Sequence, residues 1–156
     1  MEHTFYGVTE VNLDDKGRVI IPVRYRGMLE GGLFVTHGLN GCVWIMTPSK
    51  WDEVNGKLAT VEMSMDFDSL LCAGELIQLD RQGRLTIPPP LRRYAGLVAV
   101  DPETRAETVV EKVVMAGARR RLEIWQPERW EQRAERASKV AADHDPNKAL
   151  LIKLGL

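Results

Sequence analysis

The sequence has few cysteines and histidines, and neither type forms a metal-binding pattern. Cys42 and Cys72 are 30 positions apart, without a CxxC or Cys/His spacing, and are best interpreted as buried thiols in a reducing cytosol. The three histidines show no HxxxH or HExxH spacing. The serines occur in no GxSxG elbow, and the glycines form neither GxGxxG nor a P-loop. We therefore expect no metal, no cofactor, no small-molecule substrate and no enzymatic activity.

Long apolar runs are also missing. No stretch approaches the ~20 apolar residues of a membrane-spanning helix. Residues 1–4 have neither the basic region nor the apolar stretch of a secretory signal. We therefore expect a cytoplasmic protein without a membrane partner.

Positive charge is scarce overall but unevenly distributed. The net charge of −1 argues against a protein that coats nucleic acid generically. Residues 14–26 nevertheless contain four basic residues and two acids, and residues 80–93 contain four basic residues and one acid. Residues 119–121 are three consecutive arginines, interpreted as a charged hairpin tip.

The two basic stretches belong to an internal repeat. Residues 11–22 (VNLDDKGRVIIP) return as residues 77–88 (IQLDRQGRLTIP), each position shifted by 66. The repeat keeps an aspartate, a glycine, an arginine and a proline in register, namely Asp14, Gly17, Arg18, Pro22 and Asp80, Gly83, Arg84, Pro88. A duplicated Asp-x-x-Gly-Arg turn between apolar strands indicates one supersecondary unit present twice.

Each half shows the order strand, turn, strand, short helix, hairpin, long helix. In the first half these are residues 5–13, 14–17, 19–21, 23–29, 33–36 with 42–46, and a long helix that follows Thr47. Thr47 is expected to cap the long helix, and Pro22 is expected in the first turn of the short helix. In the second half they are residues 75–79, 80–83, 85–87, 88–96, 108–116 with 122–125, and a helix from Pro127. The second half carries 13 additional residues, which we place in a polar loop extension at 98–107.

This order predicts an α+β, mainly β, fold. The repeats are expected at 5–60 and 75–142, with a linker helix at 61–74 and a tail at 143–156. Each half is too small to bury a sufficient core alone. We therefore expect the short strands to interleave into one common barrel with the helices outside.

The repeated turn allows a structural and a functional interpretation. Structurally, the aspartate caps the turn, the glycine bends it and the arginine pairs with the aspartate. Functionally, basic side chains on projecting turns contact phosphates or guanine edges, and the candidates are Lys16, Arg18, Arg81 and Arg84. Both interpretations can be correct, because a turn must be rigid to present a basic side chain. Arg24 and Arg26, with Arg92 and Arg93, either form a solvated helix face or widen the basic patch.

The two copies of the repeat are followed by the segments RYR and PPLRRYAGL. With these segments, the sequence resembles the MraZ family over residues 5–141. The resemblance implies two AbrB-type (SpoVT-AbrB) swapped-hairpin units, a double-split β-barrel, fused in one chain. It also implies a ring-shaped homo-oligomer in the cytoplasm and nucleoid that regulates transcription. Its target would be double-stranded DNA, at repeated short boxes upstream of its own operon in the division and cell wall gene cluster.

The resemblance assigns DNA contact chiefly to Lys16 and Arg18, and the second turn would mainly hold the barrel together. Two features depart from the family pattern: Tyr6, where many relatives carry a basic residue, and the 98–107 extension. The alternative is a protein-interaction module of the AbrB antitoxin type. The long acidic tail that usually binds the partner in such modules is missing from this sequence.

Overall fold

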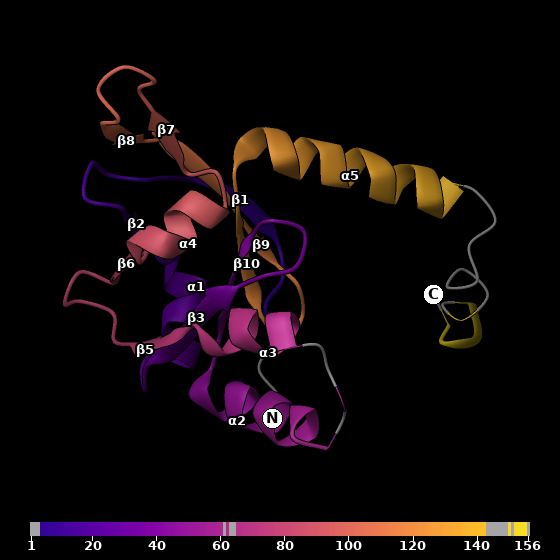
Figure 1. The fold of residues 1–156 in the computed structure, drawn as a ribbon. Coiled ribbons are helices and arrows are strands. Elements are labelled where there is room, and N and C mark those ends of the chain that lie inside the picture. The colour runs from indigo at the N-terminus through magenta and orange to yellow at the C-terminus, as the bar shows by residue number, and fades with distance from the viewer. Residues whose placement is uncertain (1–3, 61, 63–64, 143–149, 151, 156) are drawn as a thin grey trace. The chain divides into compact units, whose positions relative to one another are not determined.

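The computed structural model describes residues 4–60, 62, 65–142, 150 and 152–155 (Figure 1). The chain divides into two compact units, residues 1–126 and 127–156, and each is described by itself. Both repeated turns lie in the first unit. Within the described residues, no helix has the length and apolar character needed to cross a membrane.

The helices and strands follow the predicted order, with one addition in the second half. The first half contains β1 (Val8–Asn12), β2 (Arg18–Ile20), α1 (Val23–Arg26), a 3-10 turn η1 (Gly27–Leu29), β3 (Leu33–His37), β4 (Val43–Met46) and α2 (Pro48–Leu58). After α3 (Met65–Cys72), the second half contains β5 (Glu75–Ile77), β6 (Arg84–Thr86), α4 (Pro89–Tyr94), β7 (Val98–Val100), β8 (Glu107–Val109), β9 (Lys112–Gly117) and β10 (Leu122–Trp125). The second unit contains α5 (Pro127–Ala142).

The main sheet exchanges strands between the two halves. Its order is β1-β9-β10-β4-β3-β5, so the first strand of each half pairs with the hairpin of the other half. Glu10 lies opposite Val114, and Leu76 lies opposite Phe34. Glu10 and Leu76 are 66 positions apart, which is the shift of the repeat. The predicted α+β fold with interleaved halves is confirmed.

A second, shorter ladder lies on the pseudo-twofold axis between the halves. β2 pairs antiparallel with β6, and Val19 lies opposite its own repeat mate Leu85. The Ile21 amide donates to the Gly83 carbonyl at 2.9 Å, and the Ile87 amide donates to the Gly17 carbonyl at 2.8 Å. Each turn is therefore hydrogen-bonded to the strand end of the other half.

The halves share one apolar core. Its fully buried side chains come from both copies and include Val19, Ile21, Leu33, Ile45, Leu85, Ile87, Leu122 and Ile124. Burial of one such side chain contributes about 1.5–3 kcal/mol. Neither copy can therefore be removed without exposing apolar surface of the other.

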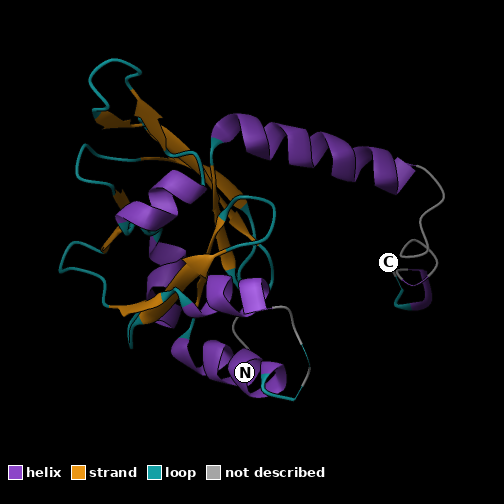
Figure 2. Cartoon of the chain, in the orientation of Figure 1, coloured by secondary structure: helices purple, strands orange, loops and turns teal. Residues whose placement is uncertain are grey.

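The helices of the first unit lie outside its sheets, and α2 and α3 are attached by specific contacts (Figure 2). The predicted cap of α2 is confirmed, because the Lys50 amide donates to Thr47 Oγ1 at 3.1 Å. The Trp51 ring of α2 stacks on Phe34 of β3, with centroids 4.0 Å apart. The Thr36 hydroxyl donates to the Leu71 carbonyl of α3 at 2.8 Å. Pro22 occupies the N-cap of α1, one position before the first helical turn where it was predicted.

Two predictions for the second half are wrong. Residues 98–107 are not a loop, because β7 and β8 pair as an antiparallel ribbon with Val98 opposite Val109. Residues 108 and 109 consequently belong to this ribbon, and the strand that pairs with β10 begins at Lys112. The physical reason is that valines and a threonine on both sides of the polar stretch favour strand pairing. Most of the predicted tail, 143–156, lies outside the described residues.

Candidate nucleic-acid interface

The first turn, residues 14–18, is held by the carboxylate of Asp14. Its Oδ1 accepts hydrogen bonds from the amides of Lys16 at 3.0 Å and Arg18 at 2.8 Å. Its Oδ2 accepts from Arg18 Nε at 2.6 Å, an ion pair whose side chains are 26% and 35% exposed for Arg18 and Asp14. The Gly17 amide donates to the Asp14 carbonyl at 2.9 Å. The predicted capping role of Asp14 and its pairing with Arg18 are present.

The second turn, residues 80–84, repeats this geometry. Asp80 Oδ1 accepts from the amides of Gln82 and Arg84, both at 2.9 Å, and Oδ2 accepts from Arg84 Nε at 2.7 Å. The Gly83 amide donates to the Asp80 carbonyl at 3.0 Å. Two turns of different sequence thus adopt one conformation, because the residues that build it are those the repeat preserves.

Both turn carboxylates have pKa values below the usual range. For Asp14, partial burial would raise the pKa, but hydrogen bonds from the Arg18 backbone and side chain and from the Lys16 amide outweigh it. For Asp80, the hydrogen bond from the Arg84 amide is the largest cause of the lowered pKa. Each carboxylate is therefore ionised at neutral pH and keeps its arginine in place.

Each turn glycine lies under an arginine that follows the other copy. Gly17 and Gly83 have φ of +77° and +75°, a conformation that disfavours a side chain. A Cβ on Gly17 would collide with the Arg92 guanidinium, and one on Gly83 would collide with Arg26. Arg26 Nε also donates to the Ile21 carbonyl at 2.7 Å. Arg26, predicted as a DNA contact, thus braces the second turn.

The remaining predicted basic residues are placed differently. Lys16 and Arg81 are exposed, and within the described part of the chain no hydrogen bond or ion pair of their side chains is found. Arg24 is exposed and its guanidinium lies over the Tyr25 ring, 4.6 Å from the centroid. Both turns project from the same side of the strand layer (Figure 2). The structure therefore brings the two turns to one face, with Lys16 and Arg81 accessible to a ligand.

The triple arginine at 119–121 lies in a different region. Arg121 pairs with the buried Glu123 at 3.0 Å, and its guanidinium lies 4.3 Å from the centroid of the Trp44 ring. The Trp44 indole donates to Glu123 Oε2 at 3.0 Å. This buried carboxylate was missed from the sequence, since a glutamate in a strand carries no signal that indoles and an arginine surround it.

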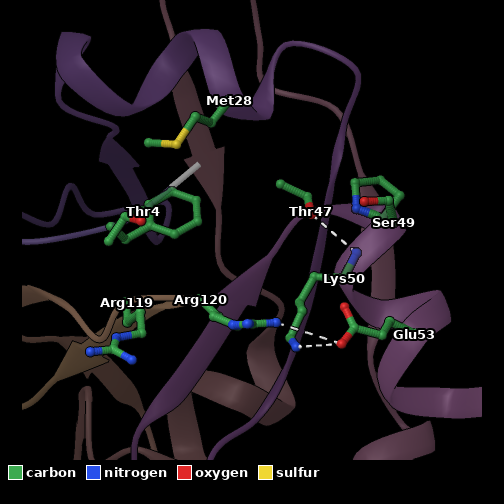
Figure 3. A pocket seen from close by; sticks show the side chains of 10 residues that line it. Thr4, Met28, Thr47, Ser49, Lys50, Glu53, Arg119 and Arg120 are labelled. Carbon is green, nitrogen blue, oxygen red and sulfur yellow. Dashed lines mark hydrogen bonds and ion pairs between the residues drawn. The ribbon is translucent and has the colours of Figure 1, made fainter. Parts of the chain in front are cut away.

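A cavity of about 720 Å³ lies beside the start of α2, lined by Lys50, Glu53, Arg119 and Arg120 among others (Figure 3). Glu53 accepts from Lys50 at 3.3 Å and Lys57 at 3.0 Å, and it lies 3.6 Å from Arg120. These contacts partly neutralise the basic groups of the cavity. The two exposed turns are the better candidate for binding a polyanion. Among the described residues no cluster of acidic, cysteine or histidine side chains could hold a metal ion.

Comparison with known proteins gives a consistent result. A family model described as "MraZ protein, putative antitoxin-like" matches residues 4–71 and again residues 70–152, so two copies cover nearly the whole chain. The chain is 36% identical over 132 residues to the transcriptional regulator MraZ of Parafrankia sp., which covers 81% of this chain and 84% of the relative. It is 35% identical over 130 residues to that of Thermus thermophilus, covering 80% and 83%. It is 31% identical over 150 residues to that of Lactobacillus delbrueckii subsp. bulgaricus, covering 90% and 96%.

Proposed function

The chain belongs to the MraZ family, and we propose that it is a non-enzymatic transcriptional regulator that binds specific DNA sequences through turns 14–18 and 80–84. The observation that carries this proposal is the pair of rigid turns exposing basic side chains on one face. The similar proteins are named transcriptional regulators, which supports a role at DNA.

The turns suit DNA because their basic groups are preorganised. Within the described part of the chain, the side-chain hydrogen bonds from Arg18 and Arg84 to Asp14 and Asp80 use Nε, so the terminal Nη groups remain for a phosphate or a guanine edge. Lys16 and Arg81 add a second cation to each turn. A side chain already held in place loses less conformational entropy on binding. Arg24 would extend the patch, whereas Arg26 would act through the position of the second turn.

The two turns of one chain offer few cations, which indicates that several chains act together. Binding through a few phosphate contacts is weak and falls steeply with salt. Several subunits on tandem boxes gain affinity through effective concentration. We therefore propose a ring-like homo-oligomer on repeated boxes upstream of its own operon in the division and cell wall cluster, within the nucleoid. The acidic remainder of the chain would limit non-specific coating.

A second candidate function is an antitoxin-like module that binds a protein partner. It is favoured by the description of the matching family model as putative antitoxin-like. In that case the basic face would contact an acidic protein surface instead of DNA.

To separate the two functions, the affinity of the protein is measured for a DNA fragment from the upstream region of the operon and for a shuffled fragment of equal length. Wild type is expected to prefer the upstream fragment and to weaken with salt. The double variant Arg18→Ala/Arg84→Ala should lose this binding, whereas Arg136→Ala, an exposed arginine on α5, should retain it. Equal binding of the double variant and wild type would refute the assignment to the turns. Absence of wild-type DNA binding, with capture of a tight acidic protein partner, would favour the second candidate.

A further inference from the structure

The additional residues of the second half build an ordered arm, residues 98–109. Its strands pair in register through Ala99 and Thr108, and Asp101 closes its tip by accepting from the amides of Glu103 at 2.8 Å and Thr104 at 3.0 Å. At its base, Arg93 pairs with Glu107 at 2.6 Å. The tip between the strands carries Asp101, Glu103 and Arg105, all exposed. The arm is thus a hydrogen-bonded hairpin in which acidic side chains outnumber basic ones.

The arm lies beside the first turn. The Leu13 amide, directly before the turn, donates to the carbonyl of Glu111 at 2.8 Å. A cavity of about 530 Å³ is lined by Asp15 of the turn and by Glu107 and Glu111 at the base of the arm. Arg92, which lies on Gly17, lines the same cavity. The positive charge of Arg92 therefore faces carboxylates as well as the turn.

Among the described residues, no corresponding arm flanks the second turn. The equivalent cavity there, about 290 Å³, is lined by Arg26, Arg81, Glu30 and Asp80. The charges of this lining are two arginines and two acids, whereas the lining beside the first turn has one arginine and three acids. The connection from η1 to β3 in the first half spans only residues 30–32, and no ribbon projects from it.

The turns themselves differ in the same direction. The first turn reads DDKGR, with two acids and two bases, and is neutral. The second turn reads DRQGR, with one acid and two bases, and carries one positive charge. At physiological salt, exposed charges are screened beyond about 8 Å, so the groups around each turn dominate its local field.

We propose that the second turn, through Arg81 and Arg84, contributes more DNA affinity than the first, because Asp15 and the acidic arm oppose a phosphate approaching Lys16 and Arg18. The inference rests on the proposed function and differs from the family resemblance, which assigns DNA contact chiefly to the first turn. Its physical basis is that phosphate contacts gain from local positive charge and lose from carboxylates beside them.

The test compares Lys16→Ala and Arg81→Ala on operator DNA, after thermal unfolding confirms that both variants fold. Both side chains are exposed and hold no hydrogen bond or ion pair within the described residues, so neither change should disturb its turn. Arg81→Ala is expected to weaken binding about tenfold and Lys16→Ala by less than about threefold. An equal or larger loss for Lys16→Ala would overturn the inference and leave DNA binding itself intact. Failure of wild type to bind would overturn both.

A second comparison tests the role of the arm. Neutralising one exposed acid at its tip and one at its base, Glu103→Gln/Glu111→Gln, should raise the affinity for DNA and increase the cost of a further Lys16→Ala change. The matched control is Asp52→Asn/Asp66→Asn, which removes two exposed acids from α2 and α3. An equal rise in the control would refute a local effect of the arm.

Discussion

Replacement of Asp14 by alanine tests whether one carboxylate holds the first turn. The change removes the acceptor of three hydrogen bonds, two from the backbone amides of Lys16 and Arg18 and one from Arg18 Nε. The Gly17 to Asp14 backbone bond remains, so the chain keeps a turn but loses its cap.

The expected cost follows from these contacts. A hydrogen bond of this kind contributes about 1 kcal/mol net, which gives about 2 kcal/mol for the two amides. The ion pair is about one third exposed, so solvent limits its contribution to at most about 1 kcal/mol. The total of about 2–3 kcal/mol corresponds to a fall in Tm of about 5–10 °C for a chain of this size.

Thermal unfolding at pH 7, followed by circular dichroism, measures this cost. Asp14→Asn is the matched variant, since its amide oxygen can still accept from the two backbone amides, and its Tm should fall by only about 2–4 °C. Asp80→Ala should change Tm in the same direction because the second turn has the same bonds. A Tm for Asp14→Ala within about 1 °C of wild type would contradict the capping role.

Three further predictions concern the core, the glycines and acid stability. Leu85→Ala, at a fully buried site shared by both halves, should lower the free energy of unfolding by about 2–5 kcal/mol. The first unit should still unfold in one transition, and separate transitions for the halves would show that they do not share a core. Gly83→Ala should lower Tm because of the positive φ of this residue and the collision with Arg26. Gly56→Ala in α2, where a Cβ meets open space, should raise Tm, and equal changes of Tm for the two variants in calorimetry would refute this. The lowered pKa values of Asp14 and Asp80 stabilise the fold above their unfolded pKa of about 3.9, and this contribution is lost as the pH falls through the folded values. The free energy of unfolding in urea is measured at pH 7 and at about pH 3. Between these two pH values the double variant Asp14→Asn/Asp80→Asn should lose less stability than wild type.

The repeat explains how much of the fold the sequence predicts. A shift of 66 positions relates the two turns, the strand residues Glu10 and Leu76, which lie opposite Val114 and Phe34, and the facing residues Val19 and Leu85. Duplication of a unit with half a core forces the copies to share strands, so the interleaving follows from the pattern. The conformation of each turn follows from Asp-x-x-Gly-Arg because its hydrogen bonds are local.

Contacts between the halves could not be predicted in this way. Arg26 was interpreted as part of a basic helix face, but its side chain lies on Gly83, which is 57 positions further along the chain. The sequence predicts a polar loop at 98–107, because the strands that pair there are only three residues long on each side and flank a polar stretch. Packing between the halves decides the place of Arg26, whereas the arm is a local hairpin whose short strands give only a weak sequence signal.

The salt dependence of binding to the upstream operon fragment tests the central claim most directly. Equilibrium binding is measured at several salt concentrations for wild type and for Lys16→Ala/Arg81→Ala, and the slope of log affinity against log salt is compared. If the turns contact phosphates, the variant should bind more weakly and its slope should be smaller in magnitude by about two per chain. An unchanged slope together with unchanged affinity would contradict the assignment of DNA binding to the two turns.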